Sequence, residues 1–68
     1  MKDIRKTYGE RLRAFRKNKI LSQEELSFKS SLHRTYISEV ERGRRNISIV
    51  NIAKIAKALR IRIKDFFD

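Results

Sequence analysis

Residues 22–43 read SQEELSFKSSLHRTYISEVERG, and their pattern predicts two short helices. Ser22 is followed three residues later by Glu25, and this spacing is a capping box, the arrangement that satisfies the first free amides of a helix. We therefore expect the first of the two helices to begin at Ser22. Leu26, Ser27 and Ser30 then lie on one face of this helix.

The second helix is expected from about His33 to Arg42. Its apolar residues fall on one side, and they are Tyr36, Ile37 and Val40. Gly43 follows as a residue that can adopt left-handed backbone and end the helix. Only two or three residues separate the two helices. Two short helices joined by such a tight turn form a helix-turn-helix, which we place at about residues 22–42.

The rest of the chain also follows helical periods. An N-terminal helix is predicted from an apolar stripe with spacings of three or four, formed by Ile4, Tyr8, Leu12 and Phe15. Ser48 can cap a further helix, whose inward face is predicted to hold Ile49, Ile52, Ala53, Ala56 and Leu59. Residues 61–67 are interpreted as an extended link and one short closing helix. The sequence therefore predicts a single all-α domain over residues 1–68.

The composition indicates a polyanionic partner. Eighteen Lys and Arg side chains against eight Asp and Glu give a net charge of +10 on 68 residues. Nucleic acid is the first candidate partner for such a chain, and the alternative is that the basic residues only keep a small domain soluble. Without cysteine the chain can form neither disulfides nor thiolate metal sites, and we expect a cytoplasmic protein. No signal peptide or membrane-spanning run is recognised, so no membrane partner is expected.

The outward face of the helix at about 33–42 carries polar side chains. At about 100° per residue, the residues opposite the apolar side are Thr35, Ser38, Glu39 and Arg42, with Arg34 at the flank. Arginine can donate two hydrogen bonds to guanine, and serine or threonine can bond to any base. A carboxylate at Glu39 would repel phosphates, so an ion pair with a nearby arginine is its expected role. This face therefore suits the reading of base edges.

Five segments of the chain carry a resemblance to a known family. They are GERLRAFR at 9–16, SQEEL at 22–26, RTYIS at 34–38, ERG at 41–43 and IAKIAKAL at 52–59. Over roughly residues 8–67 the chain resembles the helix-turn-helix family that includes Cro/C1-type phage repressors and the controller proteins of restriction-modification systems. The RTYIS segment is most similar to the controller proteins. The resemblance implies a five-helix domain that dimerises on a palindromic operator, with its third helix in the major groove.

The family's contacts can be transferred to the matching positions of this chain. The resemblance implies that the base-reading residues are Arg34, Thr35 and Ser38. It implies that the residues in contact with DNA phosphates are Gln23, Tyr36, Arg44 and Asn46. It also implies a structural ion pair between the first helix and the end of the third, formed by Arg16 and Glu41. The chain departs from the family at Ser27, where alanine is usual, and at Ser31, where glycine is usual, and serine adopts left-handed backbone less readily than glycine.

The sequence leaves two groups of apolar residues without an assigned neighbour. The C-terminal group, Ile61, Ile63, Phe66 and Phe67, can complete the core of the monomer or contribute to the dimer contact that a symmetric operator requires. The predicted dimer interface consists of Ile61, Ile63 and Phe66. Phe28 lies at least about 140° around its helix from the inward residues, and we expect another part of the fold to cover it rather than a second protein.

Other functions find little support in the sequence. His33 is the only histidine, and the chain has no cysteine and no glycine-rich phosphate loop, so we expect no metal site, no cofactor, no small-molecule ligand and no catalysis. The alternative function is an antitoxin that binds a toxin protein and also represses its own promoter. RNA binding is a second rival, although RNA-binding proteins usually expose aromatic side chains for stacking. The preferred prediction is a homodimeric regulator of transcription that binds double-stranded DNA.

Overall fold

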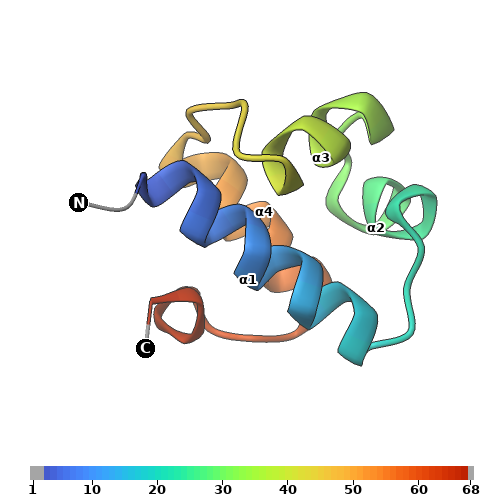
Figure 1. The fold of residues 1–68 in the computed structure, drawn as a ribbon. Helices are drawn as coiled ribbons and strands as arrows, with labels where there is room; N and C mark the ends of the chain where they lie inside the picture. The colour runs from blue at the N-terminus through green and yellow to red at the C-terminus, as the bar shows by residue number, and fades with distance from the viewer. Residues whose placement is uncertain (1–2, 68) are drawn as a thin grey trace.

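The computed structural model describes residues 3–67 and contains helical elements throughout. In chain order these are α1 (Ile4–Asn18), α2 (Gln23–Ser30), α3 (Arg34–Glu41), α4 (Ile49–Leu59) and the 3-10 helix η1 (Ile63–Phe66) (Figure 1). No strand occurs within residues 3–67, so the predicted all-α class is confirmed. The predicted closing helix is a single 3-10 turn, so these residues form four α-helices and one shorter element rather than five full helices. None of these helices is long and apolar enough to cross a membrane.

Two of the helices, α2 and α4, begin directly after the capping residues predicted for them. The Ser22 side chain accepts a hydrogen bond from the Glu25 amide, and the Glu25 carboxylate accepts one from the Ser22 amide at 2.9 Å. Ser48 caps α4 in the same way, by accepting from the Asn51 amide at 3.2 Å. Asp3 caps α1 through a bond from the Arg5 amide, which sequence reasoning did not identify. These caps satisfy amides that have no acceptor within their own helix.

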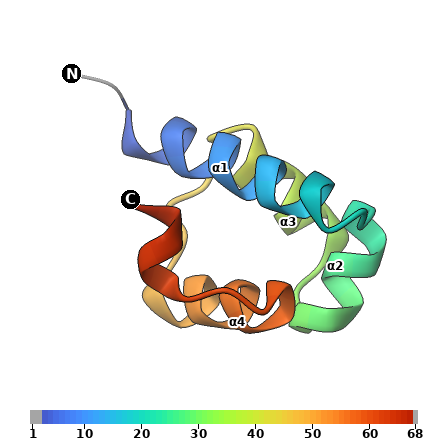
Figure 2. The ribbon, with the colours of Figure 1, turned by 90° about the horizontal axis from the view of Figure 1, so that it is seen from below.

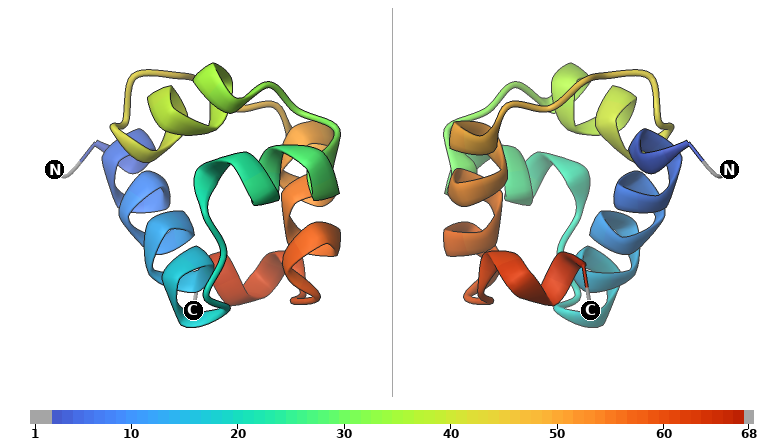
Figure 3. Two further views of the ribbon diagram at one scale, coloured as in Figure 1. Left: turned by 90° about the vertical axis from the view of Figure 1, so that its right-hand side faces the viewer. Right: turned by 90° about the vertical axis from the view of Figure 1, so that its left-hand side faces the viewer.

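The helices surround one apolar core. In Figure 3, α1 and α4 form opposite sides, α3 crosses one end, η1 crosses the other, and α2 lies between them. Seen from below in Figure 2, η1 covers the end of the space between α1 and α4. The buried apolar residues are Tyr8, Leu12, Leu26, Ile37, Val40, Ile55, Ala56, Leu59 and Phe66. Every helix therefore contributes to the core, and α2 and α3 are held on the same body.

Phe66 of η1 lies inside this core and not at a surface. Its exposed fraction is 0%, and its ring centroid lies 4.8 Å from that of Tyr8 and 5.5 Å from that of Phe15. The prediction that Phe66 contributes to a dimer interface is therefore wrong, because its side chain is enclosed by its own subunit. The aromatic contacts instead fix η1 against α1.

The inward face of α4 differs from the predicted one. Ile49 is 74% exposed and Ala53 is also exposed, whereas Ile55, which was not assigned inward, is fully buried. Ile55 shares its side of the helix with Ile52, Ala56 and Leu59. At about 100° per residue, Ala53 lies more than a quarter turn from the centre of this stripe, and Ile49 begins the helix beyond the edge of the core.

The expectation that the fold covers Phe28 is also wrong. The side chain is 80% exposed on α2, and nothing within residues 3–67 covers it as expected. Residues 4–18 form α1, which packs against α3 and does not cover Phe28.

A glycine brings α1 close to the end of α3. A Cβ atom added at Gly9 would approach the Val40 carbonyl oxygen too closely for any real contact and would lie 2.7 Å from the Glu41 carbonyl oxygen. Only glycine leaves room for the two backbones to cross at this distance. This crossing carries the later residues of α1 to the end of α3 and to the start of α2.

Candidate nucleic-acid interface

The turn between α2 and α3 is tight and uses left-handed backbone at Ser31. The φ and ψ angles of Ser31 are 60° and 28°, and the Leu32 amide donates back to the Ser27 carbonyl at 3.2 Å. Serine thus occupies the conformation for which glycine is the usual residue. His33 then begins α3 with an extended backbone and no side-chain cap. The two helices and this turn have the geometry of a helix-turn-helix over residues 23–41.

The three predicted base-reading residues lie along one side of α3. Arg34 and Thr35 are exposed in its first turn, and Ser38 is half-buried one turn later. The Arg34 guanidinium lies 3.8 Å from the Glu24 carboxylate, with both side chains largely in solvent. An ion pair this long and exposed holds its partners weakly, so Arg34 remains available to another acceptor.

Tyr36 is partly buried, and both ends of its side chain have neighbours. Its hydroxyl accepts a hydrogen bond from the Asn51 side-chain amide at 3.1 Å, which ties α3 to α4. The Arg45 guanidinium lies over its ring, 5.3 Å from the centroid, and also bonds to the Glu39 carboxylate at 2.8 Å. Among the hydrogen bonds of residues 3–67, the Tyr36 hydroxyl acts only as an acceptor. Glu39 forms the surface ion pair that was expected of it, with Arg45 as a partner that sequence reasoning did not identify.

The Arg16 guanidinium and the Glu41 carboxylate meet in a two-point contact. The Nε–Oε2 distance is 2.7 Å and the Nη2–Oε1 distance is 3.0 Å, and the two side chains are only 10% and 4% exposed. The hydrogen bond to Glu41 raises the pKa of Arg16 above its already high value. Arg16 also donates to the Leu21 carbonyl at 2.8 Å, so the pair joins α1, the loop that follows it, and the end of α3.

Gln23, predicted to contact phosphate, belongs to the same network. It is the first residue of α2, and its side-chain amide donates to Glu41 Oε1 at 3.1 Å. This bond holds the start of α2 against the end of α3. Its backbone amide lies in the first turn of the helix, where amides have no intrahelical acceptor and favour an anion.

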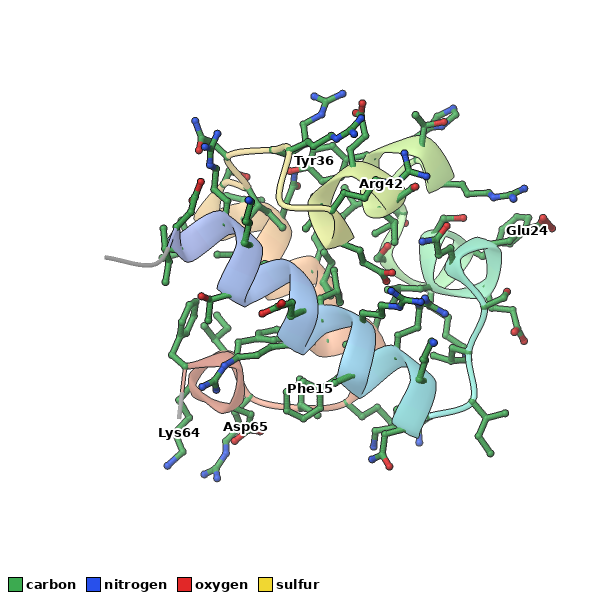
Figure 4. The ribbon with its side chains drawn as sticks, viewed as in Figure 1. Phe15, Glu24, Tyr36, Arg42, Lys64 and Asp65 are labelled. Atoms are coloured by element: carbon green, nitrogen blue, oxygen red, sulfur yellow. The ribbon has the colours of Figure 1, made fainter. Side chains whose placement is uncertain are left out.

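The loop after α3 presents the remaining predicted phosphate contacts. Gly43 has a φ of +75°, and the Arg44 amide donates to the Glu39 carbonyl at 2.9 Å, which closes the helix. Arg44 and Asn46 are both exposed in this loop. In Figure 1 the loop runs beside α3 along the upper edge of the molecule, and in Figure 4 Tyr36 and Arg42 lie at that edge while Lys64 and Asp65 lie at the opposite one.

Apolar side chains are also exposed outside the helix-turn-helix, in the first turns of α1 and α4 and in the segment of η1. These exposed apolar residues are Ile4, Ile49, Val50, Ile63 and Phe67, of which Ile4 and Phe67 line one pocket. The right-hand view of Figure 3 shows the backbone of these elements, with the starts of α1 and α4 on opposite sides and η1 at the lower end. Ile61 is half-buried against the core, whereas Ile63 is 38% exposed. Of the three predicted dimer residues, Ile63 is thus the one with its side chain most available to a partner.

The comparisons with known proteins agree with this geometry. The family model described as helix-turn-helix matches residues 12–66. The control protein C.BamHI of Bacillus amyloliquefaciens is 51% identical over 67 residues, which are 97% of this chain and 83% of the relative.

Two solved structures extend the likeness to three dimensions. The restriction-modification controller protein C.AhdI of Aeromonas hydrophila has 51% identity and a TM-score of 0.91, over 93% of this chain and 96% of that one. C.Esp1396I, solved as a tetramer in complex with its natural 35 base-pair operator, has 34% identity and a TM-score of 0.89, over 98% of this chain and 88% of that one. This chain therefore belongs to the helix-turn-helix family, alongside the controller proteins of restriction-modification systems.

Proposed function

We propose that the protein regulates transcription by binding a palindromic DNA operator as a homodimer, with α3 in the major groove, as a restriction-modification controller. The observation that carries this proposal is the outer face of α3, which presents Arg34, Thr35 and Ser38 on a short helix whose other side is locked into the core. Its support from a relative is C.Esp1396I, which was solved as a tetramer on operator DNA.

The side chains proposed to bind bases determine sequence preference, whereas those proposed to bind phosphates only position the protein on DNA. Arg34, Thr35 and Ser38 are proposed to bond to base edges. The proposed phosphate contacts are Gln23, Tyr36, Arg44 and Asn46. Tyr36 fits this role because its hydroxyl accepts from Asn51 and keeps its own proton to donate to a phosphate oxygen. Such bonds to phosphate fix the register of the helix but carry no sequence information.

A symmetric operator requires two copies of the chain, and the exposed apolar side chains support this. Ile49, Val50 and Phe67 are each at least half exposed on a domain that carries a net charge of +10. Exposed apolar groups favour a protein contact, and a self-complementary contact gives the two-fold symmetry that a palindrome needs.

The test is a selection of bound sites from a random duplex pool. The wild-type protein should return one palindromic site. Thr35→Ala and Ser38→Ala should each lose about 1–3 kcal/mol on that site and relax its base preference at one or two positions per half-site. Arg44→Ala should weaken the selected site and random DNA alike, and should lower the salt slope by about one for each phosphate that the variant no longer binds.

The control is correct folding of each variant, measured by urea unfolding. The proposed role of α3 is excluded if correctly folded Thr35→Ala and Ser38→Ala keep the wild-type preference at every base position. A log–log salt dependence near zero for the wild-type protein would remove DNA binding altogether, because phosphate contacts release counterions.

Antitoxin activity is the second candidate, and the exposed Phe28 favours it. A phenylalanine that is 80% exposed offers an apolar anchor for another protein outside the proposed dimer surface. Co-purification of a stoichiometric small protein that Phe28→Ala releases would support this candidate, whereas a pure homodimer would reject it.

A further inference from the structure

We propose that a cleft between α1 and the helix-turn-helix holds one phosphate of the DNA backbone, with Arg13 and Arg42 as its cationic walls. The cleft has a volume of about 240 Å³, and its lining residues are Arg13, Arg16, Gln23, Ser38, Glu41 and Arg42. This inference rests on the proposed DNA binding and adds α1, which lies outside the helix-turn-helix, to the DNA-contacting surface.

The charges of the cleft leave it strongly positive. Three arginines against one glutamate give two net positive charges. Arg16 and Glu41 neutralise one another through their short two-point contact, so the excess charge belongs to Arg13 and Arg42. Both of these side chains reach solvent, and within residues 3–67 neither has a carboxylate partner. An arginine pair without a carboxylate favours an anion between its members.

The start of α2, which lines one side of the cleft, offers uncharged hydrogen-bond donors to the same anion. Gln23 begins α2, and the amides of a first helical turn have no acceptor within the helix. The bond from Gln23 to Glu41 fixes where this helix start lies relative to α3. The partial positive charge at a helix start and the nearby guanidinium groups act on an anion in the same direction.

The position of the cleft identifies the anion as part of DNA. Ser38 lines the cleft and also lies on the face of α3 that is proposed to read bases. A phosphate in the cleft therefore lies next to a helix in the major groove, where the backbone borders the groove. Its contact fixes α1 and α3 together on the duplex and is independent of base sequence.

The experiment measures the salt dependence of DNA binding by fluorescence anisotropy, on the selected operator and on a random duplex. The variants are Arg13→Ala, Arg42→Ala and the double variant. Lys57→Ala is the control, because it removes one exposed positive charge from a groove on α4 shared with Lys29, outside the cleft. Since both arginines contact one phosphate, the double variant should lower the slope by about 0.9 in total, and each single variant by no more than this. Lys57→Ala should leave the slope unchanged.

Methylphosphonate substitution, which removes the charge of one phosphate at a time, locates the contact. At one position per half-site it should weaken binding by the wild-type protein and have a much smaller effect on the double variant, which keeps only the neutral donors of α2. Equal losses of affinity for both proteins at every position would overturn the inference, as would a summed slope change of about two for the double variant, which would indicate two separate phosphates. Inorganic phosphate at matched ionic strength should displace DNA no better than chloride. Phosphate-specific displacement that is abolished in the double variant would instead make the cleft a site for free phosphate.

These outcomes separate the two proposals. If the wild-type protein shows no salt-dependent binding to DNA, the proposed function fails. If the wild-type protein binds its operator and the double variant behaves like Lys57→Ala, only the cleft inference fails. Circular dichroism and urea unfolding of the arginine variants confirm that any weaker binding does not come from unfolding.

Discussion

The Arg16–Glu41 pair shows how much a single contact can hold together. It is nearly enclosed, it bonds at two points, and it receives a third bond from Gln23. Burial makes such a pair expensive to form, so its net contribution to stability is small while its loss on one side is costly. Its value lies in fixing where α1, α2 and α3 meet, which is also where the proposed phosphate cleft lies.

Replacing Glu41 by Ala should therefore destabilise the fold far more than replacing Glu24 by Ala. The first change leaves the Arg16 guanidinium buried without its carboxylate and should cost about 3–5 kcal/mol. The second breaks only a 3.8 Å contact between exposed side chains, and exposed pairs contribute about 0–1 kcal/mol. Urea midpoints of the two variants make the comparison, and equal shifts would contradict a structural role for the pair.

Contacts between individual side chains were the part of the site that could be predicted least well from the sequence. The roles of Arg16 and Glu41 came from the family resemblance, because no local pattern connects residues 25 positions apart. The stacking of Arg45 on Tyr36 was missed for the same reason, since it depends on how the loop after α3 folds back. The exposed position of Phe28 was also missed, because the sequence does not say what covers a helix face.

The elements themselves were more predictable, because helix starts depend on a few neighbouring residues. The capping residues Ser22 and Ser48 were identified correctly from local spacing alone. The inward face of α4 was not, because its sequence IVNIAKIAKAL is apolar on more than one side, and the pattern then fits several rotations. Which rotation is adopted depends on the packing against α2 and η1, and this is tertiary information.

Replacing Gly9 by alanine should destabilise the protein, although the same replacement usually stabilises a helix. In an exposed helix interior, Gly→Ala stabilises by about 1 kcal/mol. Here the new Cβ would press on the backbone carbonyls at the end of α3, which cannot move aside as a flexible side chain can. Overpacking of this kind costs about 1–3 kcal/mol, so Gly9→Ala should lower the urea midpoint.

An exposed helical position in the same element supplies the control. Asn18, at the end of α1, should accept alanine with little change in stability. A Gly9→Ala variant as stable as the wild-type protein would show that α1 and α3 do not approach as closely as this crossing requires.

At the scale of the whole molecule, the surface proposed to read DNA and the surface proposed to join two copies are different parts of the protein. The α3 helix and the loop that follows it lie along one edge (Figure 1), whereas the exposed apolar residues belong to the first turns of α1 and α4 and to the segment of η1. This separation lets two copies associate through these residues while each presents α3 to DNA. The sequence predicted that the C-terminal segment takes part, but it could not distinguish the buried Phe66 from the exposed Ile63, since both are apolar and only three residues apart.

The dimer can be tested by placing a charge among the exposed apolar residues of α1, α4 and η1. Ile63→Asp and Val50→Asp should each give a folded monomer that binds one half-site weakly, because a carboxylate in a subunit contact must lose its water without gaining a partner. Ile61 is a poorer choice, because it packs against the core and its replacement threatens the fold. The matched control is Ile20→Asp, since Ile20 is 88% exposed in the loop after α1, outside these elements. Sedimentation at tens of micromolar should show a dimer for the wild-type protein and for Ile20→Asp. If Ile63→Asp and Val50→Asp both remain dimers, or if the wild-type protein is a monomer, the two copies do not associate through this surface.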